Sequence, residues 1–235
     1  MAYDRNGNKI TSYIKDEVSN KTSIRYLDNT IAKYMFYKII QDEKYADVWY
    51  NDTIKHFICI KCPVYDGHQR GTRNKDMNLS IVVKNKKLGD FVSTVYNDWL
   101  INDNVAELFQ RHNLTGYKLK PVNVCNMELA YNLWELVVIG KGGEAHPDSG
   151  IVKTYQCEHC NTVNYRAFKN GIGIIVDENN WDGSDFFTIT AYPKFILVNE
   201  KVKSIIKNNK LKGVKLILST DLKRPEYFSD EISPH

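Results

Sequence analysis

Five cysteines are the residues whose type and spacing suggest chemistry most directly. Four of them form two C-x-x-C pairs, Cys59 with Cys62 and Cys157 with Cys160, and Cys125 stands apart. A C-x-x-C turn brings two thiolates within reach of one metal ion, and two such turns complete a tetrahedral four-cysteine zinc site. The pairs lie about a hundred residues apart, much farther than in a zinc ribbon. A shared site therefore requires the fold to bring the two pairs together.

Three interpretations of these pairs stay open. The four cysteines could ligate one zinc ion, they could be reduced thiols that pack as small apolar residues, or they could be redox dithiols. The redox interpretation is the weakest, because neither pair opens a helix as in thioredoxin-like proteins. Three histidines near the pairs could substitute as ligands, although each fits an ordinary surface histidine better: His56, His68 and His159. Cys125 has no partner in the sequence, and we expect it to be a buried apolar residue.

Two further segments invite a functional interpretation, and for both a structural one is preferred. The string Trp181-Asp182-Gly183-Ser184-Asp185-Phe186-Phe187 contains a turn signal followed by a strand, which favours a turn anchored by buried aromatics over a binding corner. Gly140–Pro147 reads as a loop, because it does not fit the P-loop pattern. His146 lies close to Asp148, but no nucleophile motif accompanies them. We therefore do not expect an enzyme; an active site near Gly142 and His146 is the weakest hypothesis.

Composition excludes several classes of protein. The chain has 235 residues, 43% hydrophobic and 26% charged, with a formal net charge of +4. Such values exclude a disordered chain, a collagen and a coiled coil. No apolar run reaches 18 residues, and the polar N-terminus has no signal-like apolar segment. We expect a cytoplasmic protein with no membrane partner.

Hydrophobic periodicity predicts the elements that would hold these residues. Apolar residues recur at helical spacing from Thr22 to about Glu43, namely Ile24, Leu27, Ile31, Met35 and Ile39. Residues 53–61 and 79–83 are typical of strands. Trp99–Asn102 leads into a helix capped by Asn102 or Asp103, and Gly116 near its end precedes a strand.

The same unit returns ninety-seven residues later. Over the 22 positions from Asp98, seven residues are identical at this offset: Leu100, Asn102, Val105, Leu114, Gly116, Lys118 and Leu119. Cys59 lies 43 residues before Asn102, and Cys157 lies 42 before Asn199. Shared cap chemistry alone would explain the asparagine and the glycine, but it explains the paired C-x-x-C less well. The pattern favours an internal duplication.

We therefore predict an α+β fold with two similar sheet-plus-helix halves, preceded by an N-terminal helix that docks on the first half. The boundaries are 1–50 for the N-terminal segment and helix, 51–125 for the first C-x-x-C half and 126–235 for the second.

Taken together, the two cysteine pairs, the Trp181–Phe187 string and the closing segments Ile196–Glu200 and Leu211–Val214 resemble the double-CXXCG motif immunity proteins of bacterial toxin–immunity systems. The resemblance covers residues 157–218 best, and residues 59–122 through the repeat. The glycine that follows each pair in that family is replaced by Pro63 and Asn161. Asn can adopt a positive φ, whereas Pro cannot.

The resemblance implies a bacterial cytoplasmic antitoxin that binds a cognate protein toxin. The cysteine spacing adds one candidate zinc site, on Cys59, Cys62, Cys157 and Cys160, and otherwise no cofactor is expected. The alternative is a zinc-knuckle nucleic-acid-binding protein that would use basic and aromatic residues: Lys84, Lys86, Lys87 and Tyr96. Because the net charge of +4 argues only weakly for it, nucleic acid is not the expected partner.

Overall fold

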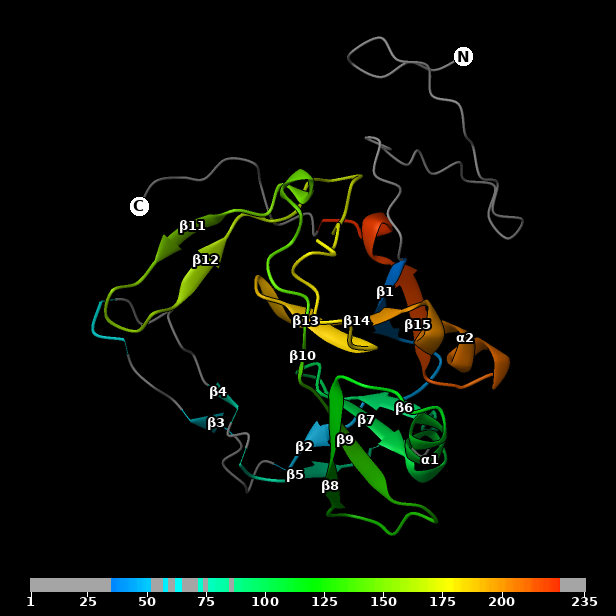
Figure 1. Ribbon diagram of the computed structural model, residues 1–235. Helices are drawn as coiled ribbons and strands as arrows, with labels where there is room; N and C mark the ends of the chain where they lie inside the picture. Colours follow the sequence, from blue (N-terminus) through cyan, green and yellow to red (C-terminus); the bar gives the residue numbers. More distant parts are fainter. Residues whose placement is uncertain are drawn as a thin grey trace. The chain divides into compact units, whose positions relative to one another are not determined.

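The computed structural model describes residues 35–51, 57–58, 62–64, 72–73, 76–84 and 87–224 (Figure 1). All of them fall within one compact body, Tyr34–His235. These residues form strand-rich sheets with two α-helices, which confirms the predicted α+β class.

One sheet has five strands in the order β10-β13-β14-β1-β15. Its strands are β1 (Phe36–Gln41), β10 (Gly140–Lys141), β13 (Phe186–Ile189), β14 (Tyr192–Asn199) and β15 (Val214–Leu218). β10 pairs with β13 in parallel, and the other neighbours are antiparallel.

A second sheet has six strands in the order β2-β5-β8-β9-β7-β6. Its strands are β2 (Trp49–Tyr50), β5 (Leu79–Val82), β6 (Phe91–Ser93), β7 (Trp99–Asn102), β8 (Tyr117–Val124) and β9 (Leu133–Val138). Two small hairpins stand outside both sheets, β3 (Phe57–Ile58) with β4 (Thr72–Arg73), and β11 (Lys153–Gln156) with β12 (Val163–Tyr165). Two short 3-10 turns complete the elements, η1 (Pro147–Ser149) and η2 (Ser219–Asp221).

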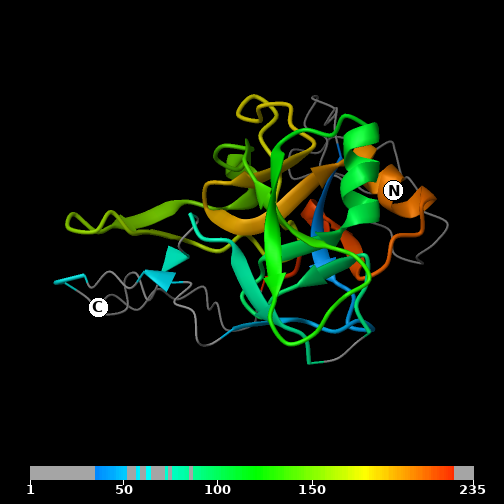
Figure 2. The same ribbon diagram turned by 90° about the horizontal axis from the view of Figure 1, so that it is seen from below.

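Each of the two helices follows a strand directly and begins at an asparagine cap. The Asn102 side chain accepts a hydrogen bond from the Val105 N–H at 3.0 Å and starts α1 (Asp103–Arg111). Asn199 accepts from the Val202 N–H at 3.2 Å and starts α2 (Glu200–Asn208). Such caps satisfy backbone donors that the first helical turn leaves without partners. The helices lie beside one another (Figure 2), and the Lys201 ammonium donates to the Asn113 carbonyl across the gap at 3.4 Å.

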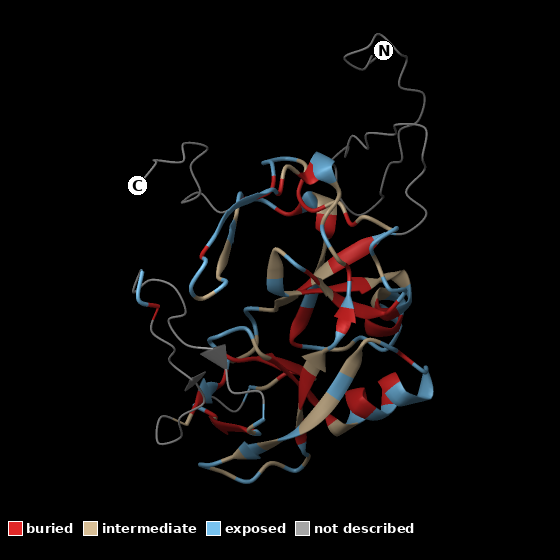
Figure 3. Cartoon of the chain, turned by 60° about the vertical axis from the view of Figure 1, so that its left-hand side comes forward, coloured by how far each residue is buried: buried red, intermediate tan, exposed pale blue. Residues whose placement is uncertain are grey.

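The largest apolar core joins residues from both sheets and both helices. Phe109 of α1 packs against Phe186 of β13, with ring centroids 5.1 Å apart, and both side chains are fully buried. Two smaller clusters lie elsewhere, one around Phe187 and Leu197 and one around Ile81 and Leu100. Figure 3 shows the buried stretches concentrated in the strands and on one side of each helix.

The segments Asp90–Lys118 (the first unit) and Asp185–Lys215 (the second unit) make matching hydrogen bonds. The Asp90 carboxylate accepts from the Asn102 side chain at 3.0 Å and from the Lys212 N–H at 2.7 Å. The Asp185 carboxylate accepts from the Asn199 side chain at 2.8 Å and from the Thr115 N–H at 2.8 Å. Each aspartate therefore holds its own helix cap and the loop that follows the helix of the other unit.

The predicted helix over Thr22 to about Glu43 is wrong in its last part, because Phe36–Gln41 form β1. β1 lies between β14 and β15 and buries Tyr37 and Ile39 in the shared core. Aromatic and β-branched residues favour a strand once partners are present, although Met35 and Ile39 also fit a helical spacing. The rest of the predicted helix, up to residue 34, lies outside the described residues, and so does its predicted docking on the first half.

Two predicted strands agree with the structure where their residues are described. Residues 79–83 were predicted as a strand, and Leu79–Val82 form β5. Of the strand predicted over 53–61, only Phe57–Ile58 are described, and they form β3. Within the described part of the chain, no helix is long and apolar enough to cross a membrane. The predicted domain boundaries at residues 50 and 125 remain predictions.

Candidate metal centre

The second cysteine pair occupies the tip of the β11–β12 hairpin. The Asn161 N–H donates to the Cys157 carbonyl at 2.9 Å, and the Cys157 N–H donates to the Thr162 carbonyl at 2.9 Å. Asn161 adopts φ 58°, which confirms the expectation that an asparagine can take the left-handed conformation here. The backbone thereby folds the C-x-x-C segment into a tight turn between two strands. Since it opens no helix, the reason for disfavouring a redox motif holds for this pair.

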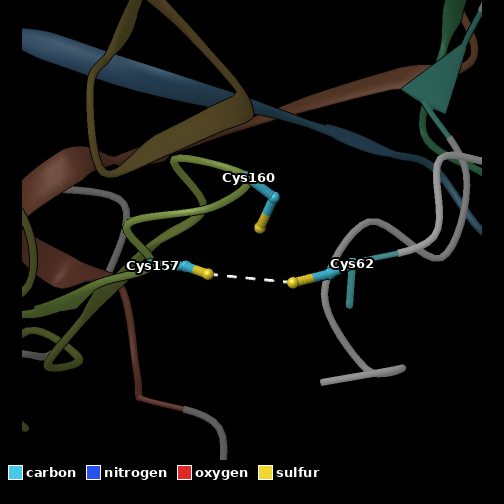
Figure 4. A group of neighbouring side chains, drawn as sticks. All are labelled: Cys62, Cys157 and Cys160. Carbon is cyan, nitrogen blue, oxygen red and sulfur yellow. Dashed lines mark hydrogen bonds between the residues drawn. The ribbon is translucent and has the colours of Figure 1, made fainter. Parts of the chain in front are cut away.

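Cys62 reaches this tip from a distant segment of the chain (Figure 4). Its Sγ lies 3.7 Å from the Sγ of Cys157, across 95 residues of sequence. The sulfurs of Cys62, Cys157 and Cys160 all lie within 4.8 Å of one another. Two sulfurs bound to one tetrahedral zinc at about 2.3 Å each would be roughly 3.8 Å apart, which is close to the observed separation. The three side chains therefore fit a metal ion.

The surroundings of the cluster suit thiolates. Cys157 is fully buried and Cys62 is 3% exposed. The backbone N–H of Cys160 donates to the Cys157 sulfur and lowers the pKa of Cys157 to about 6; the His159 N–H and the neighbouring thiols act in the same direction, and desolvation opposes them. The Val64 N–H also points at the Cys62 sulfur, at 3.4 Å. Thiolates are the form of cysteine that binds metals.

The interpretation of the cysteines as small packing residues fits this arrangement less well. Among the described residues, none of the three apolar core clusters contains a cysteine. The hairpin that carries Cys157 has four exposed residues in β11. A buried thiol at the end of an exposed hairpin is explained by its sulfur neighbours rather than by a hydrophobic core.

The remaining predicted site residues divide into three groups. Cys59, His56 and His68 lie outside the described residues. His159 is exposed and is not part of the sulfur cluster. The prediction that Cys125 is buried is wrong: its thiol is exposed, near the Asn123 amide at 3.8 Å. β8 ends at Val124, and the next residue, Cys125, lies at the surface. The apolar character of the Cys125 side chain therefore does not lead to its burial.

Sequence reasoning missed Tyr155, a neighbour of the cluster. A hydrogen bond to the Cys157 sulfur raises the pKa of the Tyr155 hydroxyl above its usual range. The signal was present, because residues two apart on a strand share a face and Tyr155 stands two before Cys157. The Cys160 thiol donates to the Thr162 hydroxyl at 3.2 Å, a second contact that spacing alone did not indicate.

The two other candidate segments are structural, although the segment predicted as a loop, Gly140–Pro147, begins with β10 and ends at the first residue of η1. The Asp182 carboxylate accepts from the Lys141 N–H at 2.8 Å and from Ser184, while the Trp181 ring packs against Phe187 at 5.7 Å. This confirms a turn anchored by aromatics. The His146 imidazole accepts from the Asp148 N–H at 3.3 Å and caps η1, a local structural role.

Three residues named for nucleic-acid binding are exposed: Lys84, Lys87 and Tyr96. The Lys84 ammonium sits 3.8 Å from the centroid of the Trp49 ring, and the Tyr96 ring stacks on Tyr50 at 4.9 Å. Lys86 lies outside the described residues. These contacts leave nucleic-acid binding an untested alternative.

Compared with known proteins, the chain matches no family model and no curated protein with statistical significance. The function therefore has to be argued from the residues themselves.

Proposed function

We propose that the cysteine cluster holds one structural zinc ion, with Cys62, Cys157 and Cys160 as three ligands and Cys59 as the fourth. The observation that carries this proposal is the convergence of three sulfurs, from both C-x-x-C pairs, within 4.8 Å. Four thiolates complete the tetrahedral shell of zinc and leave no open position for substrate, so the ion would cross-link two segments rather than catalyse.

The zinc content of the purified protein tests this proposal. We expect close to one equivalent of zinc per chain, and a loss of most of it in the Cys157→Ser, Cys160→Ser variant, because removing two thiolates breaks the site. The Cys125→Ser variant is the matched control, since this thiol is exposed and stands outside the cluster. Less than about 0.2 equivalents in the wild-type protein would contradict the proposal.

We further propose that the protein is a bacterial cytoplasmic immunity protein that neutralises a cognate toxin by protein–protein contact. Two lines support this. Cys62, the Cys157–Cys160 pair and the Trp181–Phe187 segment, which help to carry the resemblance to double-CXXCG immunity proteins, belong to one folded body. The segment weighed as an active site, around His146, is occupied with a structural hydrogen bond. A binding protein needs a complementary surface and no reacting groups of its own.

Co-expression tests the immunity proposal. The neighbouring genes are examined first: a large secreted toxin encoded beside this chain would supply the toxic domain used as the probe, and a neighbour of unrelated metabolic type would contradict the proposal. We expect the chain to restore growth of cells that express the toxic domain and to co-purify with it. A zinc-free variant that still folds should protect in proportion to the folded fraction. Growth arrest that is unrelieved by the wild-type chain would overturn the proposal.

We also infer that the two units derive from an internal duplication. Support comes from the reciprocal roles of Asp90 and Asp185, described above, and from the two asparagine caps. The residues two positions beyond the helices match as well: Asn113 has φ 47° and Lys210 has φ 51°. Two unrelated units with the same cap chemistry would not need hydrogen bonds in which the aspartate of each unit holds the loop of the other.

A further inference from the structure

The second unit carries a concentration of positive charge that the first unit lacks. Residues 200–215 contain six lysines and one acidic residue, Glu200. The lysines are Lys201, Lys203, Lys207, Lys210, Lys212 and Lys215. When the units are aligned on their caps, five of these positions are neutral in the first unit: Asn104, Ala106, Gln110, Asn113 and Thr115. Because α1 forms the same helix and loop without them, the fold does not require these lysines.

Within the described residues, three of the lysines also have no acidic partner. Lys201, Lys203 and Lys215 pair with Asp185, Glu200 and Asp42 at 3.5, 2.9 and 3.0 Å. Lys207, Lys210 and Lys212 are exposed, and in the described part of the chain no carboxylate pairs with them. We call these three residues the lysine surface. It lies at the end of α2 and in the turn that follows, on the outer side of the molecule (Figures 1 and 2).

Lys210 stands in a conformation that disfavours it. Its φ of 51° is left-handed, and the equivalent residue of the first unit, at φ 47°, is Asn113. Asparagine tolerates this region, whereas a lysine there has a conformational cost. A costly residue that the fold does not need points to a role outside folding. Complementing the α2 dipole accounts for Lys207, in the last turn, whereas Lys210 and Lys212 follow the end of the helix.

We propose that the lysine surface binds an acidic surface of a partner protein, and that this partner is the toxin; the inference thus rests on the proposed function. Charge complementarity at an interface speeds encounter and selects partners. The segment 200–215 contains no aromatic residue and no arginine, so it lacks the groups that stack on bases or read guanine. Carboxylates of a protein are the ligand it fits better.

The first unit supplies the residues for the test variant. Lys207→Gln, Lys210→Asn and Lys212→Thr place the neutral residues of the first unit at the equivalent positions, and Lys210→Asn removes the conformational cost. The matched control changes three exposed lysines elsewhere, Lys118, Lys194 and Lys223, to glutamine, with the same change of net charge. Thermal unfolding of both variants shows that they remain folded.

The measurement is the affinity of each protein for the toxic domain at low and physiological salt, with a 20-base-pair DNA duplex as a second probe. We expect the test variant to bind the toxin roughly tenfold more weakly or worse, with a shallower salt dependence, and the control to bind within about twofold of wild type. Equal toxin binding by wild type and test variant would overturn this inference alone. A wild-type chain that does not bind the toxin would overturn the proposed function and the inference with it. Tight, salt-sensitive DNA binding that only the test variant loses would overturn the assignment to a protein partner.

Discussion

At the scale of single residues, two glycines determine how closely the units approach. Gly116 and Gly213 have φ 83° and 87°, the left-handed conformation that glycine commonly adopts after a helix. A Cβ on Gly213 would lie 1.9 Å from the Phe91 carbonyl oxygen, and a Cβ on Gly116 would lie 2.0 Å from that of Phe186. The sequence indicates the turn at each glycine. The close approach of the other unit's backbone is a tertiary contact, which no local sequence pattern predicts.

The chain offers a control that separates these two constraints. Gly183 also has a positive φ, of 82°, but nothing lies within 4 Å of its Cβ position. We expect Gly183→Ala to cost about 1 kcal/mol of unfolding free energy, from conformation alone. Gly213→Ala should cost about 3 kcal/mol or more, because backbone must also move. Urea unfolding measures both, and equal losses would show that the close approach contributes nothing.

At the scale of elements, prediction succeeded where local signals were sufficient. Both helices were placed correctly, because an asparagine cap, an apolar face and a closing glycine lie within one short segment. β1 was mistaken for helix because its partners, β14 and β15, lie more than 150 residues away in the chain. A central strand covered on both sides shows no clean alternation, so periodicity could not identify it.

The candidate metal centre shows the same limit. The C-x-x-C spacing pointed to both pairs, and the Asn161 turn confirmed one local expectation. Which sulfurs meet depends on how the Cys62 segment reaches the β11–β12 hairpin, and this is a tertiary property. An isolated two-stranded hairpin is marginally stable in water, so an ion bound by both segments would stabilise the tip of this hairpin.

At the scale of the whole molecule, the two units are not separate domains in packing. One apolar cluster contains residues of both, including Phe91 and Phe109 of the first unit and Phe186 and Val202 of the second. Phe186 also contacts Tyr117 of the first unit, with ring centroids 5.4 Å apart. Two halves that share one apolar core unfold together, even if they arose by duplication.

This packing predicts a single cooperative unfolding transition. Phe186→Ala should lower the stability of both units together, by about 3 to 5 kcal/mol, because it leaves a cavity in the shared core. Tryptophan fluorescence distinguishes the units when single-tryptophan variants keep either Trp99, in β7 of the first unit, or Trp181, whose ring packs against Phe187 of the second unit. We expect the two variants to report the same urea midpoint, and Phe186→Ala to shift both midpoints equally. If Trp181 reported a lower midpoint while Trp99 stayed unchanged, the units would unfold independently, and the reciprocal contacts of Asp90 and Asp185 would be too weak to couple them.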